Sequence, residues 1–93
     1  MPREITVHPV VLGRYVGRYE FAPNLVLAIG RKDARIFAQL TGQPPIEIFA
    51  SSERQFFYKA VNAQLTFEIN DEGRVLAVVL HQNGVDQRAR RID

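Results

Sequence analysis

Residues 64–70 read QLTFEIN, and polar and apolar side chains alternate along this stretch without a break. Successive residues of a β-strand point to opposite faces of the sheet. The period of two therefore places Leu65, Phe67 and Ile69 on one face and turns the polar side chains toward water. The stretch predicts a half-buried strand.

The same alternation recurs along most of the chain, interrupted by short clusters of turn-forming residues that contain Gly, Pro, Asn or Asp. Connections this short join antiparallel neighbours, because a parallel crossover needs about a dozen residues or more. We expect strands at residues 17–22, 25–31, 34–40, 45–50, 55–60, 64–70, 74–82 and 85–91.

The sequence thus predicts an all-β fold, an antiparallel up-and-down meander of about eight short strands that forms a small barrel or a half-open barrel. Before the first strand, Pro9 suits a first helical position, and Leu12 and Tyr15 share one face of a short N-terminal helical turn that plugs one end. The chain has 93 residues, and a chain this short supports one core. Residues 1–93 therefore form a single domain.

The last hairpin has a definite predicted register. Asn83-Gly84 favours a type I′ turn, in which both central residues need positive φ. Counting outward from this turn places Val78 opposite Ala89 and Leu76 opposite Arg91. Arg91 then reaches the rim of the core-facing side, where its guanidinium needs a carboxylate or carbonyl acceptor. The residues expected to point inward from the first strand of the hairpin are Leu76, Val78 and Leu80.

Large side chains on the core-facing positions are candidates for the interior. Four aromatic residues among them fill much of a small barrel, since each buries roughly 150 to 250 Å². The candidate interior or ligand-lining residues are Phe21, Phe56, Tyr58, Phe67, Val78 and Arg91. On the opposite faces of their strands, the candidate interface residues are Phe49, Phe57 and Val79, with Phe57 expected to be exposed.

No catalytic or metal-binding pattern is evident. The chain has no Cys and contains His8 and His81 as its histidines, too few ligands for a zinc site without Cys. Residues 51–53 read SSE, but no Gly-x-Ser-x-Gly surrounds them to supply an oriented base and an oxyanion site. The sequence therefore predicts a non-enzyme without a cofactor or a metal.

Charge and hydropathy limit the partners. The net charge of +2 includes a local excess at Arg88, Arg90 and Arg91, whereas phosphate recognition needs a basic face, so nucleic-acid binding is not expected. The longest apolar run, residues 75–80, is far shorter than the roughly 20 residues of a membrane span. Residues 1–5 lack the pattern of a signal peptide. The location expected is cytoplasmic as the sequence stands, and periplasmic or secreted if the chain was cut from an exported protein.

Four stretches together resemble a family of small domains of unknown function that occur at the C-terminal end of serine peptidases related to class C β-lactamases and penicillin-binding proteins. These stretches are residues 7–20 (VHPVVLGRYVGRYE), 39–44 (QLTGQP), 55–57 (QFF) and 81–84 (HQNG), the last followed by Ala89 and Arg91. The resemblance implies a lipocalin-like antiparallel barrel appended to a hydrolase, where it helps assembly or shapes access to the active site. The Ser-x-x-Lys motif of such hydrolases does not occur in this chain.

Two functions of different classes follow. The first is a non-catalytic interaction module that self-associates or docks on a serine hydrolase domain, through exposed apolar residues or through the free edges of an incompletely closed sheet. The alternative is a β-barrel that binds one small apolar ligand in its interior. They differ in whether the interior is filled or hollow.

Overall fold

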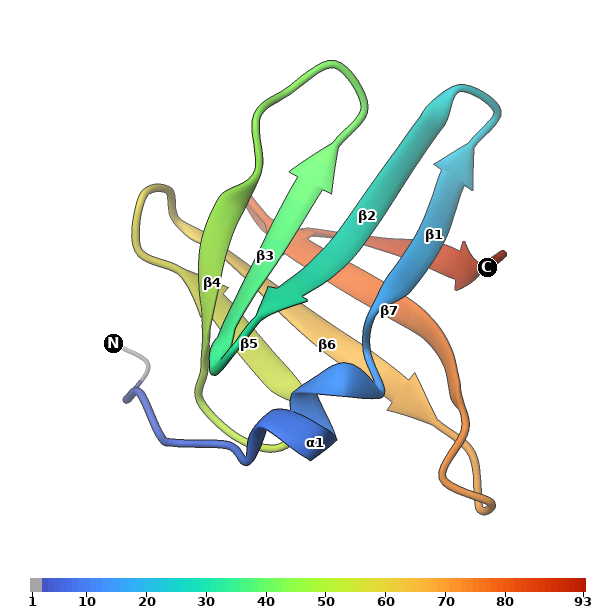
Figure 1. Ribbon diagram of the computed structural model, residues 1–93. Coiled ribbons are helices and arrows are strands. Elements are labelled where there is room, and N and C mark those ends of the chain that lie inside the picture. The colour runs from blue at the N-terminus through green and yellow to red at the C-terminus, as the bar shows by residue number, and fades with distance from the viewer. Residues whose placement is uncertain (1–2) are drawn as a thin grey trace.

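The computed structural model describes residues 3–93. Within these residues, eight strands follow one another in antiparallel order and close into a barrel, with one short helix below them (Figure 1). The elements are α1 (Pro9–Gly13), β1 (Gly17–Ala22), β2 (Leu25–Lys32), β3 (Arg35–Leu40), β4 (Ile46–Ala50), β5 (Gln55–Tyr58), β6 (Ala63–Ile69), β7 (Val75–Gln82) and β8 (Val85–Arg91). The predicted meander is confirmed, in its closed form.

The short N-terminal helix closes one end of the barrel. His8 caps it, because its Nδ1 atom accepts a hydrogen bond of 3.1 Å from the backbone N–H of Val10. Leu12 and Tyr15 are both buried. The Tyr15 hydroxyl donates to the backbone carbonyl of Glu53 in the β4–β5 loop, so the plug is tied to the strands that it covers.

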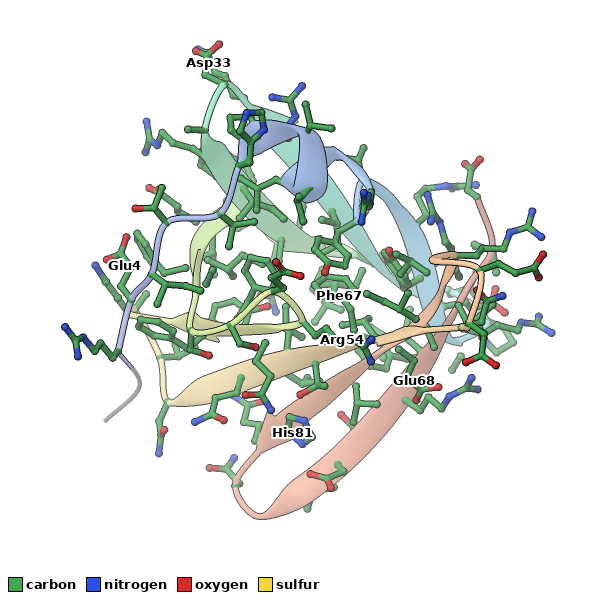
Figure 2. All side chains as sticks on the ribbon, turned by 90° about the horizontal axis from the view of Figure 1, so that it is seen from below. Glu4, Asp33, Arg54, Phe67, Glu68 and His81 are labelled. Carbon is green, nitrogen blue, oxygen red and sulfur yellow. The ribbon has the colours of Figure 1, made fainter. Side chains whose placement is uncertain are left out.

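Aromatic side chains fill the middle of the barrel. The Tyr15 ring stacks on Phe67 with 4.2 Å between centroids, and Phe56 meets Phe67 edge to face at 5.5 Å. Figure 2, viewed from the α1 end, shows Phe67 at the centre of the ring of strands. Tyr19 is also fully buried and donates its hydroxyl to the carbonyl of Tyr15 at 2.8 Å. Among residues 3–93 no charged or polar residue is buried with them.

The last hairpin has the predicted register, with Val78 opposite Ala89 and both side chains in the core. Asn83 and Gly84 have φ values of 54° and 75°, as the turn requires. The prediction for Leu76 is wrong, because its side chain is 41% exposed. On the β6 side, Ala77 pairs with Glu68 and Val75 with Ile69. Leu76 is thus the extra residue of a β-bulge, which reverses the faces beyond it and turns Val75 inward.

The seam between β1 and β8 is short, and it is reinforced by side chains. Its paired residues are Tyr19 with Arg91 and Glu20 with Arg90, and the backbone N–H of Ile92 donates to the carbonyl of Arg18. Because these strands pair, the described barrel has no free sheet edges. Association through the edges of an incompletely closed sheet, one of the two routes expected from the sequence, therefore does not apply.

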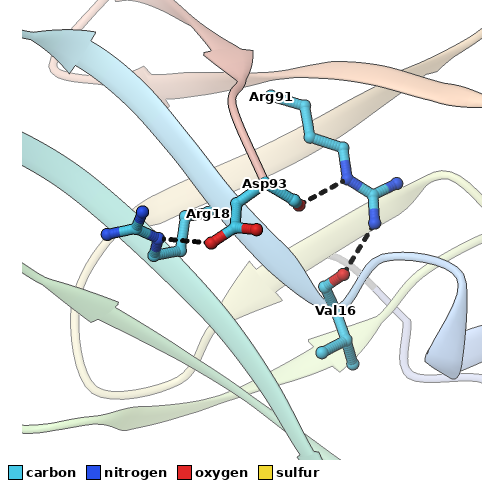
Figure 3. Close-up of polar contacts among 4 residues, drawn as sticks. All are labelled: Val16, Arg18, Arg91 and Asp93. Carbon is cyan, nitrogen blue, oxygen red and sulfur yellow. Dashed lines mark hydrogen bonds and ion pairs between the residues drawn. The ribbon is translucent and has the colours of Figure 1, made fainter.

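Arg91 has the backbone acceptors that the sequence predicted for it. Its guanidinium donates to the carbonyl of Val16 at 2.8 Å and to the carbonyl of Asp93 at 3.2 Å (Figure 3). It also reaches the carbonyl of Arg14 at 3.3 Å. Beside it, Arg18 and the Asp93 carboxylate form an exposed ion pair of 2.9 Å. The Arg91 side chain therefore joins the end of β8 to the segment between α1 and β1.

Gly17 allows this close approach. A Cβ atom at this position would lie 2.6 Å from the backbone oxygen of Asp93 and 3.0 Å from Nε of Arg91. Any larger residue would push the end of β8 away from β1. The close approach of Asp93 and Arg91 explains why the first residue of β1 has no side chain.

We expect Arg91→Ala to lower the free energy of unfolding by about 1 to 3 kcal/mol, because charged donors to backbone carbonyls are lost at the seam. Arg18→Ala is the matched control: it removes an exposed ion pair and should cost less than about 1 kcal/mol. Urea unfolding of the two variants measures both losses. Equal losses would mean that the Arg91 contacts do not hold the seam.

The tyrosines predict the response to alkali. Burial raises the pKa of Tyr19 to about 12, and burial also raises the pKa values of Tyr15 and Tyr58. In the unfolded chain the tyrosine hydroxyls lose their protons near the ordinary tyrosine pKa of about 10, whereas the folded state keeps these protons at that pH. Stability is therefore complete below pH of about 10 and declines as the pH rises toward 12. Thermal unfolding against pH, together with phenolate absorbance, tests this. Phenolate forming near pH 10 before unfolding would contradict it.

Candidate functional site

The end of the barrel opposite α1 is open. The loops between β1 and β2, β3 and β4, β5 and β6, and β7 and β8 surround it (Figure 1). A hollow of about 200 Å³ lies between them. We call this hollow the mouth. It is lined by Phe21, Leu27, Ala38, Leu40, Gln43, Pro44, Ile46, Tyr58, Val61, Ala63, Leu80 and Gln82.

The mouth is apolar with a few uncharged polar groups. Phe21, Leu80 and Tyr58 are half-buried and pack against the top of the core. Phe21 is the extra residue of a β-bulge in β1, since Glu20 pairs with Val26 and Ala22 with Leu25. Bulges re-aim side chains at the rims of barrels. This one sets an aromatic ring at the rim of the mouth.

Tyr58 supplies a hydroxyl to the mouth. The other two tyrosines donate their hydroxyls to backbone carbonyls, whereas within residues 3–93 the structure gives the Tyr58 hydroxyl no such bond. Burial alone raises its pKa. The hydroxyl therefore remains protonated at neutral pH and is available as a donor to a group that enters the mouth.

The candidate interior residues divide between three places. Phe56, Phe67 and Val78 are fully buried in the packed centre. Phe21 and Tyr58 lie at the mouth. Arg91 lies at the seam near the other end, where its guanidinium carbon is 5.9 Å from the centre of the Tyr19 ring. The structure does not bring these six residues together into one cavity.

The candidate interface residues also do not form one patch. Phe49 and Phe57 are cross-strand neighbours with ring centroids 6.0 Å apart. Val79 is two strands away, because β6 separates β5 from β7. The expectation that Phe57 is exposed is wrong: its side chain points away from the core cluster, yet it is 7% exposed.

On the outer face of β4 and β5, Phe49, the cross-strand neighbour of Phe57, lies under an intramolecular cover. The Lys59 ammonium lies 3.9 Å from the centre of the Phe49 ring, and Glu4 holds it with an ion pair of 2.7 Å. Figure 2 shows Glu4 at this side of the barrel. Alternation within a strand predicts the direction of Phe57, but it does not predict the contact of Lys59 and Glu4 with the neighbouring Phe49.

A hydrogen-bonded chain of three side chains crosses the outer face of β6, β7 and β8. Asp86 contacts Nδ1 of His81 at 2.7 Å, and Nε2 of His81 contacts the Thr66 hydroxyl at 2.8 Å. Sequence reasoning missed Thr66. The register of the last hairpin places His81 opposite Asp86, but the place of Thr66 depends on the pairing of β6 with β7, for which the sequence gives no equally strong turn signal.

This order of carboxylate, imidazole and hydroxyl is also that of a nucleophile relay. The surroundings do not fit catalysis. Thr66 lies within β6, paired with Gln55 on one side and Val79 on the other, so neighbouring backbone N–H groups serve the sheet and not an oxyanion. Residues 3–93 also contain no group of three or more His, Asp or Glu arranged for a metal.

The comparisons with known proteins concern the whole barrel. A family model described as "Domain of unknown function (DUF3471)" matches residues 1–91. The chain belongs to the DUF3471 family. This match, together with the similarity to a penicillin-binding protein given below, confirms the resemblance seen in the sequence motifs.

The DUF3471 chain is similar to penicillin-binding protein 4* of Bacillus subtilis (strain 168), with 25% identity over 85 residues. The aligned region covers 91% of this chain and 19% of that protein. The chain thus spans about a fifth of the length of the curated relative that it matches. Within the described residues of the barrel, no helix is long and apolar enough to cross a membrane.

We expect the DUF3471 barrel not to hydrolyse p-nitrophenyl esters or β-lactam reporters faster than an equal concentration of free imidazole. Thr66→Val should leave this background unchanged, because the hydroxyl lacks an oxyanion site. It should lower the free energy of unfolding by about 1 kcal/mol through the lost hydrogen bond. Turnover that disappears in both Thr66→Val and His81→Ala would show that the relay is catalytic.

Proposed function

We propose that the DUF3471 barrel is a non-catalytic accessory domain that docks on a β-lactamase-related serine hydrolase domain. Its role is to help that hydrolase assemble or to shape access to its active site. The similarity to about a fifth of penicillin-binding protein 4* supports this proposal. The remainder of that relative is long enough to contain further domains of ordinary size.

The observation that carries the proposal is the filled interior. Tyr15, Tyr19, Phe56 and Phe67 occupy the centre with at most 1% of each residue exposed. Pockets that enclose small molecules usually measure about 300 to 1,000 Å³, whereas the mouth measures about 200 Å³. A solid barrel of this kind offers surfaces to a partner more readily than it offers a cavity to a ligand.

A small apolar ligand at the mouth is the alternative. The apolar lining by Phe21 and Leu80 favours it, as does the Tyr58 hydroxyl. A ligand of this kind would be no larger than a few carbon atoms or one aromatic ring. Saturable binding of such a compound, weakened by Tyr58→Ala, is the result that would favour this alternative over docking.

The test compares a full-length hydrolase that contains the barrel with the same hydrolase from which the barrel has been deleted. Acylation of the active-site serine by a fluorescent penicillin should be unchanged, because that chemistry belongs to the hydrolase domain. The oligomeric state, or KM for large substrates, should change. A deletion that changes neither of these properties would overturn the accessory role.

A further inference from the structure

The two ends of the barrel differ in charge. The loops around the mouth carry one charged residue, Lys59, which begins the β5–β6 loop and pairs with Glu4. The rest of these loops and the strand ends beside them comprise residues 22–26, 41–46, 60–64 and 82–85, and none of these is Asp, Glu, Lys or Arg. We call this region the uncharged end. By contrast, the loops and segments at the α1 end carry Arg14, Lys32, Asp33, Arg35, Glu53, Arg54, Asp71, Glu72 and Arg74.

Three exposed apolar residues lie on the loops of the uncharged end. Leu25 is 38% exposed, Val61 is 45% exposed and Val85 is 57% exposed. They lie at or beside the tips of three different loops that surround the mouth. Together with the half-buried residues inside the mouth, they form a concave apolar surface without a charge. The depletion of charged residues is the compositional feature that distinguishes the centres of protein interfaces.

The size of the mouth indicates what kind of group enters it. A volume of about 200 Å³ accommodates one or two side chains, and it is smaller than the usual site of a metabolite or drug. Its polar groups are the Tyr58 hydroxyl and the amides of Gln43 and Gln82. Because all of these are neutral, the mouth suits an apolar side chain that stands on an uncharged surface.

The N-terminal segment lies against β4 and the β5–β6 loop. Ile5 donates its backbone N–H to the carbonyl of Ala50 at 2.8 Å, and Glu4 pairs with Lys59. A second hollow, of about 640 Å³, is lined by Glu4 together with residues 57–64, which include Val61. Glu4 therefore lies beside the β5–β6 loop, which borders the mouth at Val61.

We propose that the uncharged end holds the preceding hydrolase domain by receiving an apolar side chain of that domain in the mouth. The inference rests on the accessory function proposed above. Tethering at Glu4 supplies an effective concentration near millimolar, so a shallow contact is sufficient. The outer face of β4 and β5 is less suitable, because Lys59, held by Glu4, already lies over its Phe49 ring.

The experiment measures binding of the barrel to the purified hydrolase domain that precedes it, or that is encoded beside it, by titration of the ¹⁵N-labelled barrel. Wild-type amide shifts should concentrate at Leu25, Val61 and Val85. Val61→Glu and Val85→Glu each place a charge on the uncharged end, and each should weaken binding at least tenfold. Both side chains are exposed, so the melting temperature should not change.

Val10→Glu is the matched control, since Val10 is 68% exposed at the α1 end. It should bind within twofold of the wild type. If the wild type binds but the Val61 and Val85 variants bind equally well, the proposed surface is wrong while the accessory function stands. If the wild type does not bind the hydrolase at all, both proposals fail.

The same set of variants also tests two other occupants of the uncharged end. Light scattering that shows a wild-type dimer, lost in Val61→Glu and kept in Val10→Glu, would assign the uncharged end to a second copy of the chain. Saturable shifts at the mouth with indole, but none with the hydrolase domain, would assign it to a small aromatic ligand. Either result would overturn docking of the hydrolase at this end.

Discussion

The stack of Tyr15 on Phe67 is the contact on which the arrangement of the barrel depends. Tyr15 comes from the segment after α1 and Phe67 from the middle of β6, so one aromatic contact joins the plug to the strands. The Tyr15 carbonyl also accepts the hydroxyl of Tyr19. With that end occupied in this way, the interior opens as a shallow hollow at the opposite end of the described barrel. The filled core and the shallow mouth are two consequences of the same packing.

The order of the strands was predictable because each strand has alternating polarity and each connection is short. The register of the last hairpin was predictable because Asn83-Gly84 permits few turn geometries. Leu76 was placed on the wrong face because a β-bulge adds one residue to a strand without a clear mark in the sequence. Nothing in residues 75–80 distinguishes Leu76 from its apolar neighbours.

The candidate sites were less predictable because they are made from segments that are distant in the chain. The cover over Phe49 joins Glu4 to Lys59 across 55 positions. The relay through His81 needs the pairing of β6 with β7 as well as that of β7 with β8. Alternation gives the direction of a side chain and says nothing of what lies over it. The mouth itself needs four loops to be placed at one end, which follows only from closure of the barrel.

Closure of the barrel also gathers alternate loops at each end, so the two ends can differ in charge. In a meander every second connection falls at the same end, so a sequence can place charged loops at one end and uncharged loops at the other without changing the core. A free surface has no need of such separation, since charged loops improve solubility wherever they lie. At a contact surface, however, each unpaired charge must lose its water when a partner arrives. The loops around the mouth therefore combine few charges with a concave apolar centre, and this combination lowers the cost of a contact at this end.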